Sequence, residues 1–258
     1  MPTTLQAVSV HVDGAHGELL HPTSLTVRSG SLVVVSGEPG QGHTALSLAL
    51  AGQIHLTGGS VLIDDVHDPA RLRRVVALVD TPGVSEPEGS LPLNLVMAEE
   101  LAMAHRPAGR AAVRALLAEH GAATYAKTRW DYTPAVLRTA LLMATAAARP
   151  QTAFIVLTSP DRWGGSPQEW LDVARPWAER GYGVVLQCSE HLATAMTGPV
   201  ARLGSLTQPL DAAFEPEPRP TEPPAPPGPV PSARGELRPH AEEPALTCAP
   251  PQATRKLR

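Results

Sequence analysis

The chain has 258 residues, of which 43% are hydrophobic, and a formal net charge of −4. This length accommodates one large α/β domain or two small ones, with enough apolar residues for a packed core. The small net charge gives no long-range field that would draw the protein to nucleic acid, so we expect no nucleic-acid partner. The two cysteines, Cys188 and Cys248, provide neither a disulfide framework nor a metal-ligand spacing, which is typical of a reducing cytosol.

The sequence predicts no membrane-spanning segment. The longest apolar run, residues 140–148, is far shorter than the ~20 residues that a membrane helix needs and suits a buried helix. The first residues lack a basic start followed by an apolar core, so we expect no export signal. We therefore predict a cytoplasmic protein, and any peripheral position at the membrane would depend on a partner.

The composition divides the chain in two. After about Gly204 the sequence interleaves Pro, Glu, Ala and Gly, as in PEPRPTEPPAPPGPVP, with almost no aliphatic periodicity. Such a segment buries too little apolar surface to offset its ordering entropy. We predict a folded domain over 1–206 and a disordered, Pro-rich tail over 207–258. The tail is interpreted as a solubilising segment; the alternative is docking of its proline motifs on aromatic-lined grooves.

Within the folded part, strand-like runs alternate with helical ones. Three runs, LVVVSG, AFIVLT and GVVLQC, are continuously apolar, as expected for strands buried on both faces of a mainly parallel sheet. About seventy helix-rich residues separate RRVVALVD from AFIVLTSP, which predicts a helical insertion at about 90–150. The fold class is therefore α/β.

A glycine-rich segment, GEPGQGHT at 37–44, lies between an apolar strand and a helix. Glycines permit the backbone angles that point successive N–H groups inward, and the following helix N-terminus adds positive potential, so the segment is typical of a phosphate-binding loop. It matches the Walker A pattern GxxxxGK[ST] except at the lysine, which is His43. The candidate nucleotide-binding residues are Gly37, Glu38, Pro39, Gly40, Gln41, Gly42, His43, Thr44 and Ala45.

The exchange of lysine for His43 weakens the predicted site. Imidazole is shorter than a lysine side chain and mostly neutral near pH 7, so affinity for the β and γ phosphates should fall. Bound phosphate would raise the pKa of His43 and recover part of the charge. The alternative interpretation is a glycine turn that joins strand to helix and binds nothing.

The stretch 25–65, LTVRSGSLVVVSGEPGQGHTALSLALAGQIHLTGGSVLIDD, is similar to the opening of an ATP-binding cassette (ABC) domain, and the resemblance extends over nearly all of 5–205. It implies a P-loop NTPase-like sheet with an N-terminal antiparallel β portion and a helical insertion. It also implies ATP as ligand, with Mg²⁺ contacting the Thr44 hydroxyl. Its partners would be a membrane permease-like protein and a second cassette subunit or a homodimer copy.

The positions that carry catalysis in the ABC family are all changed. The resemblance places the family's LSGGQ motif on residues 132–136, which read YTPAV. No aromatic residue is present near Val12, where the family usually has the side chain that stacks on adenine. Loss of the Walker B carboxylates removes the support for Mg²⁺ and the group that polarises water. We predict weak or absent ATP hydrolysis with no assignable catalytic residue; the alternative is a non-catalytic regulatory scaffold. The remaining changed positions are Thr81 for the Q-loop glutamine, Thr158 and Ser159 for the Walker B Asp and Glu, and Ser189 for the switch histidine.

A different class of protein is suggested by residues 80–83, which read DTPG after an apolar strand. GTP-hydrolysing switch proteins use this motif to sense Mg²⁺ and the γ-phosphate. No Asn-Lys-x-Asp sequence is present to recognise guanine, so a GTPase-like switch is the third hypothesis. Asp80 and Thr81 join Thr44 as candidates for proximity to Mg²⁺, although Asp80 also suits a simple turn before Pro82.

Three polar residues elsewhere are interpreted as surface groups. Glu99 and Glu100 are expected on the solvated face of a helix. His191 could replace the absent switch histidine after a small loop shift, but it suits better the exposed start of a helix.

Overall fold

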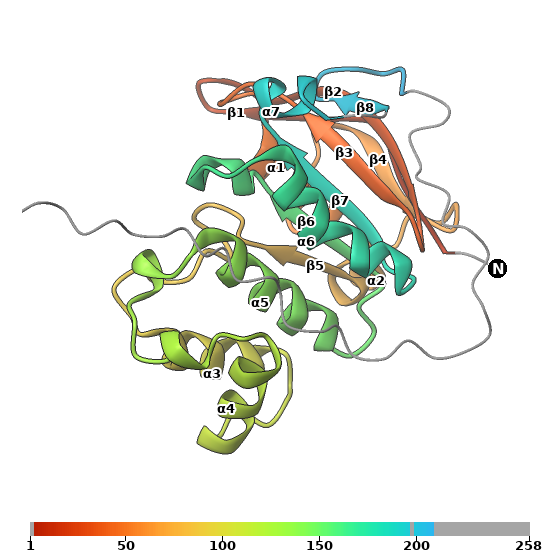
Figure 1. Ribbon diagram of the computed structural model, residues 1–258. Coiled ribbons are helices and arrows are strands. Elements are labelled where there is room, and N and C mark those ends of the chain that lie inside the picture. Colours follow the sequence, from red (N-terminus) through yellow and green to blue (C-terminus); the bar gives the residue numbers. More distant parts are fainter. Residues whose placement is uncertain (1–2, 197–198, 209–258) are drawn as a thin grey trace, which may run out of the picture.

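A computed structural model describes residues 3–196 and 199–208 as two sheets with helices packed around them (Figure 1). The five-stranded sheet has the order β5-β6-β7-β3-β8, and the three-stranded sheet has the order β2-β1-β4. Most of the predicted tail, 209–258, lies outside the described residues. The predicted fold class, a mainly parallel sheet flanked by helices with an N-terminal antiparallel portion, is confirmed.

All strand pairs of the five-stranded sheet are parallel. The three strands formed by the runs predicted to be buried are buried at every residue, because helices or the second sheet cover both faces. The pairing aligns Ser36 with Cys188 and Thr158 with Gln187, so the loops after these strands emerge at one edge of the sheet. The strands are β3 (Leu32–Ser36), β5 (Val76–Val79), β6 (Phe154–Thr158), β7 (Gly183–Cys188) and β8 (Val200–Arg202).

The antiparallel sheet covers one face of the parallel sheet, with helix α1 (His43–Leu50) packed between them (Figure 1). The core on this side combines Leu5 and Leu20 of the antiparallel strands with Leu46 of α1 and Val33 of β3. This packing holds the start of α1 against both sheets. The antiparallel strands are β1 (Thr4–Gly14), β2 (Gly17–Arg28) and β4 (Gly58–Ile63).

Helices α5 (Ala135–Ala148) and α6 (Pro167–Glu179) cover the opposite face (Figure 1). Helix α6 begins with a capping box in which Ser166 and Glu169 satisfy each other's backbone N–H groups. Its Trp170 is fully buried against the sheet. Two shorter helices, α2 (Pro69–Val75) and α7 (Glu190–Thr194), flank the ends of the sheet.

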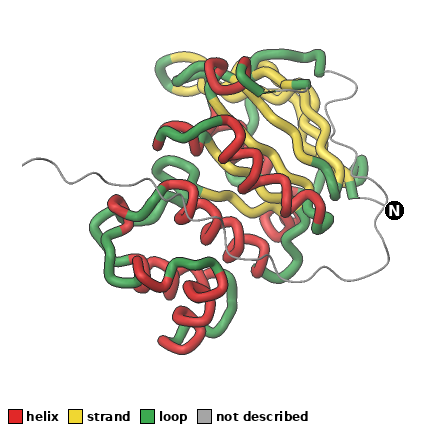
Figure 2. Tube along the Cα trace, viewed as in Figure 1, coloured by secondary structure: helices red, strands yellow, loops and turns green. Residues whose placement is uncertain are grey.

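Between β5 and β6 lies a segment that Figure 2 shows as helices and loops only. We call residues 93–132 of this segment the helical lobe; Figure 1 shows its helices on the side of α5 away from the sheet. Buried Trp130 is its largest core side chain. None of the helices in the described ranges is both long and apolar enough to cross a membrane. The lobe contains α3 (Leu93–Met103), α4 (Arg110–Glu119), η1 (Ala123–Tyr125) and η2 (Trp130–Tyr132).

One surface assignment within the lobe is wrong. Glu99 is exposed as expected, but Glu100 is half-buried because α3 packs that side of the helix inward. Burial, reinforced by the charge of Glu99, raises the pKa of Glu100 to about 7. Residue type alone suggested a solvated helix face for both residues.

Candidate functional site

The loop between β3 and α1 has the backbone geometry of a phosphate-binding loop. Gly40 and Gly42 adopt positive φ angles of 90° and 108°, which favour glycine. At Gly42 a Cβ atom would lie 2.4 Å from the carbonyl oxygen of Leu19, so β2 leaves no room for a side chain. Helix α1 begins at His43 without a side-chain cap. Its first N–H groups therefore remain available to an anion.

The imidazole of His43 is held against the end of β7. Its Nε2 donates to the carbonyl oxygen of Cys188 at 3.2 Å. Burial lowers the pKa of His43, although the Cys188 carbonyl and the charges of Asp161 and Glu38 act in the opposite direction. The side chain at the lysine position is therefore neutral at pH 7 in the empty loop.

Two residues of the loop bond to each other. The side-chain oxygen of Gln41 accepts from the N–H of Glu38 at 2.8 Å, and the N–H of Gln41 donates to the carbonyl oxygen of Glu38 at 3.0 Å. The Glu38 N–H is therefore satisfied by a side chain of the same loop. Glu38, Pro39 and Gly40 are exposed at the tip.

An uncharged hydrogen-bond network lies beneath the loop. The hydroxyl of Thr158 contacts the hydroxyls of Ser47 and Thr81 at 2.8 and 2.9 Å. Gln187 donates to the same Ser47 hydroxyl at 2.7 Å. All four residues are fully buried. The position that the resemblance assigns to the Walker B aspartate is therefore occupied by a hydroxyl already bonded to its neighbours.

Asp80 is engaged by groups of the protein itself. Its carboxylate is buried, lies 2.9 Å from Nη2 of Arg162 and accepts from the indole N–H of Trp163 at 3.0 Å. Desolvation raises the pKa of Asp80, and the nearby Arg162 only partly offsets this effect. Of the three residues considered for Mg²⁺, Asp80 and Thr81 are thus bonded to side chains, whereas the hydroxyl of Thr44 makes no hydrogen bond to a described residue.

The structure adds Asp161 to this region, which the sequence did not single out. Its Oδ2 accepts from the N–H of Ser189 at 3.0 Å. Its Oδ1 is buried and has no hydrogen-bond partner among the described residues. Its negative charge acts to raise the pKa of His43 and of Cys188, but at His43 the effect of burial is larger and the pKa is lowered. The available signal was an acidic residue shortly after a buried strand, in TSPD at 158–161.

The switch region after β7 contains no imidazole at the aligned position. Ser189 caps α7 by accepting from the N–H of Leu192. His191 lies exposed on that helix, as the sequence predicted. Burial raises the pKa of the Cys188 thiol to about 12, so it stays protonated and unreactive.

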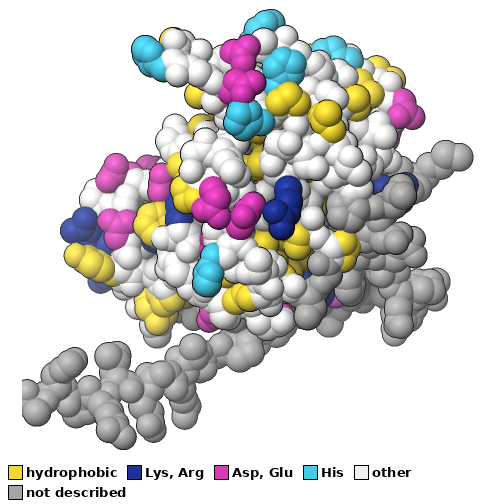
Figure 3. All heavy atoms as spheres, turned by 90° about the horizontal axis from the view of Figure 1, so that it is seen from above, with side chains coloured by type: hydrophobic (Ala, Val, Ile, Leu, Met, Phe, Trp, Pro, Cys, Tyr) yellow, Lys and Arg dark blue, Asp and Glu magenta, His cyan; other side chains and the backbone are white. Residues whose placement is uncertain are grey.

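The residues present fit phosphate better than a protein-held metal. Within residues 3–196 and 199–208, no group of three or more His, Cys, Asp or Glu side chains is placed to hold a metal ion. The hydroxyl of Thr158 stands where a carboxylate would support Mg²⁺. Figure 3 shows a face with scattered histidine and acidic side chains, so its charge is mixed.

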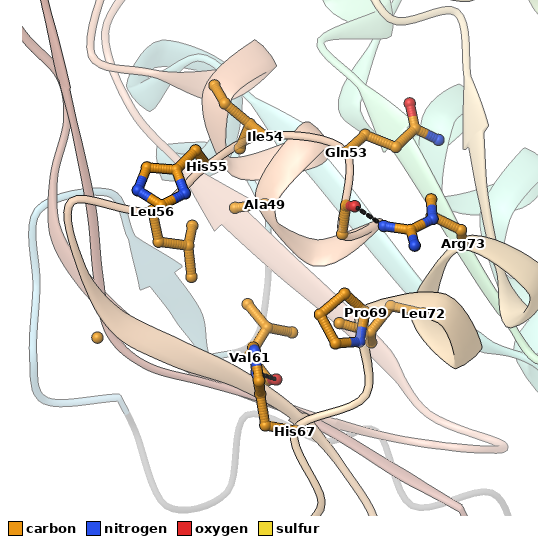
Figure 4. A pocket seen from close by; sticks show the side chains of 12 residues that line it. Ala49, Gln53, Ile54, His55, Leu56, Val61, His67, Pro69, Leu72 and Arg73 are labelled. Carbon is orange, nitrogen blue, oxygen red and sulfur yellow. Dashed lines mark hydrogen bonds between the residues drawn. The ribbon is translucent and has the colours of Figure 1, made fainter.

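A separate pocket of about 510 Å³ lies at the other end of α1, between that helix, β4 and α2 (Figure 4). Its floor is apolar, with Ala49, Val61 and Leu72 buried. Two of its polar side chains are already bonded, since Arg73 donates to the Gly52 carbonyl at 2.9 Å and His67 donates to the Val61 carbonyl at 3.0 Å. The phosphate loop precedes the opposite end of α1 and does not line this pocket.

A parallel α/β sheet with a glycine loop leading into an uncapped helix defines the class of fold, which is P-loop NTPase-like. No family model matches the chain. A nucleotide-free ATP-binding cassette from an ABC transporter superposes with a TM-score of 0.58 and 14% identity, over 80% of this chain and 90% of that one. A bacterial Atm1-family ABC exporter with ATP bound gives a TM-score of 0.57 and 17% identity, over 78% of this chain and 37% of that one.

Curated relatives match over a shorter stretch. The putrescine export system ATP-binding protein SapF of Escherichia coli K12 is 44% identical over 48 residues, which is 19% of this chain and 18% of that protein. The peptide transport system ATP-binding protein SapF of Shigella flexneri matches to the same extent. The chain thus spans under a fifth of these relatives' length. Together with the superpositions, this similarity identifies the fold as that of the ATP-binding cassettes of ABC transporters.

Proposed function

We propose that the chain binds ATP through residues 37–45, with weak or absent hydrolysis. The observation that carries this proposal is the contrast between an intact loop backbone and the uncharged network at Thr158 beneath it. The loop provides what a phosphate needs, and the strand ends lack what hydrolysis needs.

The loop supports binding mainly through its backbone. N–H groups at the start of an uncapped helix, together with left-handed glycines, can satisfy phosphate oxygens without a lysine. The free hydroxyl of Thr44 is the group closest in kind to the family's Mg²⁺ contact. Affinity is expected to be low, because neutral His43 supplies no permanent charge to the β and γ phosphates.

The chain lacks acid–base groups for hydrolysis at the positions where the resemblance places them. A general base must lie within hydrogen-bond reach of the attacking water and must be able to accept a proton. Thr158 and Ser159 carry hydroxyls where the resemblance places carboxylates, and Ser189 caps a helix where it places the switch histidine. A turnover of ~1 s⁻¹ or faster by the purified protein would contradict this part of the proposal.

The proposed setting is the cytoplasmic face of a membrane, with a permease-like partner and a second cassette subunit or a homodimer copy. The names of the curated relatives, ATP-binding proteins of export and transport systems, support this setting. Co-purification of the protein with a membrane protein from its own cell, lost on deletion of the helical lobe, would test it.

A second function, a scaffold that keeps the fold but binds no nucleotide, is favoured by one observation. His43 is bonded to Cys188 and Gln41 to Glu38, so two polar side chains of the loop are already satisfied within the protein. A nucleotide would have to displace both contacts.

Equilibrium titration with a fluorescent ATP analogue, with and without Mg²⁺, separates these functions. The test variant is Gly40→Asp, because a Cβ atom there meets nothing within 4 Å and the added carboxylate would repel phosphate. Gly42→Asp is unsuitable, since its Cβ would clash with the Leu19 backbone. Gly121→Asp is the matched control: it has a similar positive φ of 66°, equal space and the same added charge at the end of α4.

Binding that Gly40→Asp weakens and Gly121→Asp leaves unchanged supports the proposal. Binding that is absent, or indifferent to Gly40→Asp, leaves the scaffold. Competition by GTP at lower concentration than ATP would favour the switch hypothesis based on residues 80–83.

A further inference from the structure

A row of charged and aromatic side chains joins the helical lobe to the parallel sheet, and none of its residues belongs to the loop at 37–45. It consists of Trp130 in the lobe, Arg138 on α5, Arg162 and Trp163 in the short helix η3 (Pro160–Trp163), and Asp80 after β5. We call these five residues the latch. Their positions span three separate stretches of the sequence, so only the tertiary fold assembles them.

The contacts run continuously from lobe to sheet. The guanidinium carbon of Arg138 lies 5.6 Å from the ring centre of Trp130 and 4.1 Å from that of Trp163. The guanidinium carbon of Arg162 lies 4.7 Å from the same Trp163 ring. Trp163 donates to Asp80, which pairs with Arg162 at 2.9 Å. Cations over aromatic faces are attracted by the ring quadrupole, most strongly when water is excluded.

Arg162 also fastens the latch to the strand ends. Its Nη1 donates to the carbonyl oxygens of Thr158 and Ser159 at 2.9 and 3.1 Å. Its Nη2 lies 3.3 Å from Glu86 in the loop after β5. One side chain therefore ties together the loops after β5 and β6.

Two features show that forming the latch costs free energy. Arg138 is only 3% exposed and makes no ion pair with any residue in the described ranges; its guanidinium donates to the Trp130 carbonyl oxygen at 3.4 Å and lies over two indole rings. Asp80 has a φ of 54°, which is uncommon for a residue other than glycine. Such backbone strain persists only where the surroundings over-determine the conformation.

We propose that the latch fixes the helical lobe on the sheet and that Asp80 serves as its anchor rather than as a ligand of Mg²⁺. The lobe then keeps its position whether the phosphate loop is empty or occupied. This last consequence rests on the proposed function, whereas the fastening itself does not.

Hydrogen–deuterium exchange of the full chain tests the fastening without nucleotide. Trp163→Leu removes the ring between the two arginines and the N–H donated to Asp80. We expect amides of α3 and α4 to exchange about tenfold faster, while amides of β3 and β7 change much less. An equal change in lobe and sheet, or no change in the lobe, would overturn the proposal.

The matched control is Trp177→Leu on α6. Trp177 also stacks with an arginine, Arg180 at 4.6 Å, but lies outside the latch. This variant should not raise exchange in the lobe relative to the sheet. If Trp163→Leu does not fold, Arg162→Lys keeps a positive charge beside Asp80 and loses the planar stack. About threefold faster exchange in the lobe is then expected, and unchanged exchange would overturn the proposal.

A final arm adds Mg²⁺ and the fluorescent ATP analogue to the wild-type protein. With bound analogue detected by its fluorescence, lobe exchange should stay constant. Faster lobe exchange on binding would show that Asp80 has left Arg162 and would overturn the anchor role. If no analogue binds, the proposed function fails, and the comparison of variants without nucleotide still decides the fastening.

Discussion

The loop at 37–44 and the adjacent ends of β5 and β6 differ in what they present to a ligand, backbone groups in the first case and side chains in the second. The loop depends on backbone geometry, set by Gly40, Gly42 and the uncapped start of α1, and this geometry is intact. The ends of β5 and β6 present side chains instead, and there the structure has the bonded hydroxyls of Thr81 and Thr158 and the ion pair of Asp80 with Arg162. A site made of backbone tolerates side-chain exchange, because few side chains contribute its contacts.

The strongest test of this difference is Thr158→Asp, which places a carboxylate at the position that the resemblance assigns to the Walker B aspartate. The Thr158 side chain is fully buried among hydroxyls, and Arg162 bonds only the backbone carbonyl of this residue, so we expect a loss of about 3 kcal/mol in the free energy of unfolding. Thermal or urea unfolding measures this loss, with Thr158→Val as the uncharged control. A carboxylate accepted at no cost would mean that the strand end is not specialised for neutral groups.

His43→Lys should raise the affinity of the loop for the ATP analogue. A permanent charge would contact the β and γ phosphates, and we expect the analogue to bind about tenfold more tightly or better, which corresponds to about 1.4 kcal/mol. Fluorescence titration measures the change. Hydrolysis should stay undetectable, because the strand ends are unaltered. An affinity equal to that of the wild type would show that the missing lysine does not limit binding.

The pH dependence of binding should be smaller, a few-fold between pH 8 and pH 6. Burial lowers the pKa of His43 in the empty loop, and bound phosphate would raise it, so binding takes up a proton. Affinity should therefore rise as pH falls, and the rise should continue below pH 6.5, because the empty-loop pKa lies below that value. His43→Gln keeps an N–H donor but does not titrate, and it corrects for protonation of the nucleotide. Identical profiles for both proteins would remove His43 from the site.

Gln41→Ala should have the smallest effect. It removes the side-chain oxygen that accepts from the Glu38 N–H, so one more loop amide becomes available to phosphate. We expect affinity to rise about twofold, because a single exposed hydrogen bond contributes little net free energy. Parallel titrations of the wild type and the variant would show this difference. A marked fall would mean that the Gln41 side chain contacts the nucleotide itself.

The fold could be predicted from local signals. Continuous apolar runs identified β3, β6 and β7, since strands buried on both faces carry no alternation. Glycine spacing between a strand and a helix identified the loop at 37–44. These features depend on neighbours along the chain, and a sequence displays them directly.

The partners of the site residues could not be predicted in the same way. His43 bonds a carbonyl 145 residues away, and Asp80 accepts from an indole 83 residues away. Sequence patterns favoured a turn residue over a magnesium contact for Asp80 and showed none of its bonding partners. The ion pair with Arg162 became visible only in the structure.

The sequence by itself determined the α/β class, the buried strands and the glycine-rich loop at 37–44, because apolar periodicity and glycine spacing act over a few residues. Only the tertiary structure decided that His43 is held by Cys188 and that burial lowers its pKa, that Thr158 is bonded to Ser47 and Thr81, and that the latch joins lobe to sheet. The burial and charge pairing of these side chains depend on which strand ends lie next to each other at one edge of the sheet. The register of the parallel strands determines which ends these are.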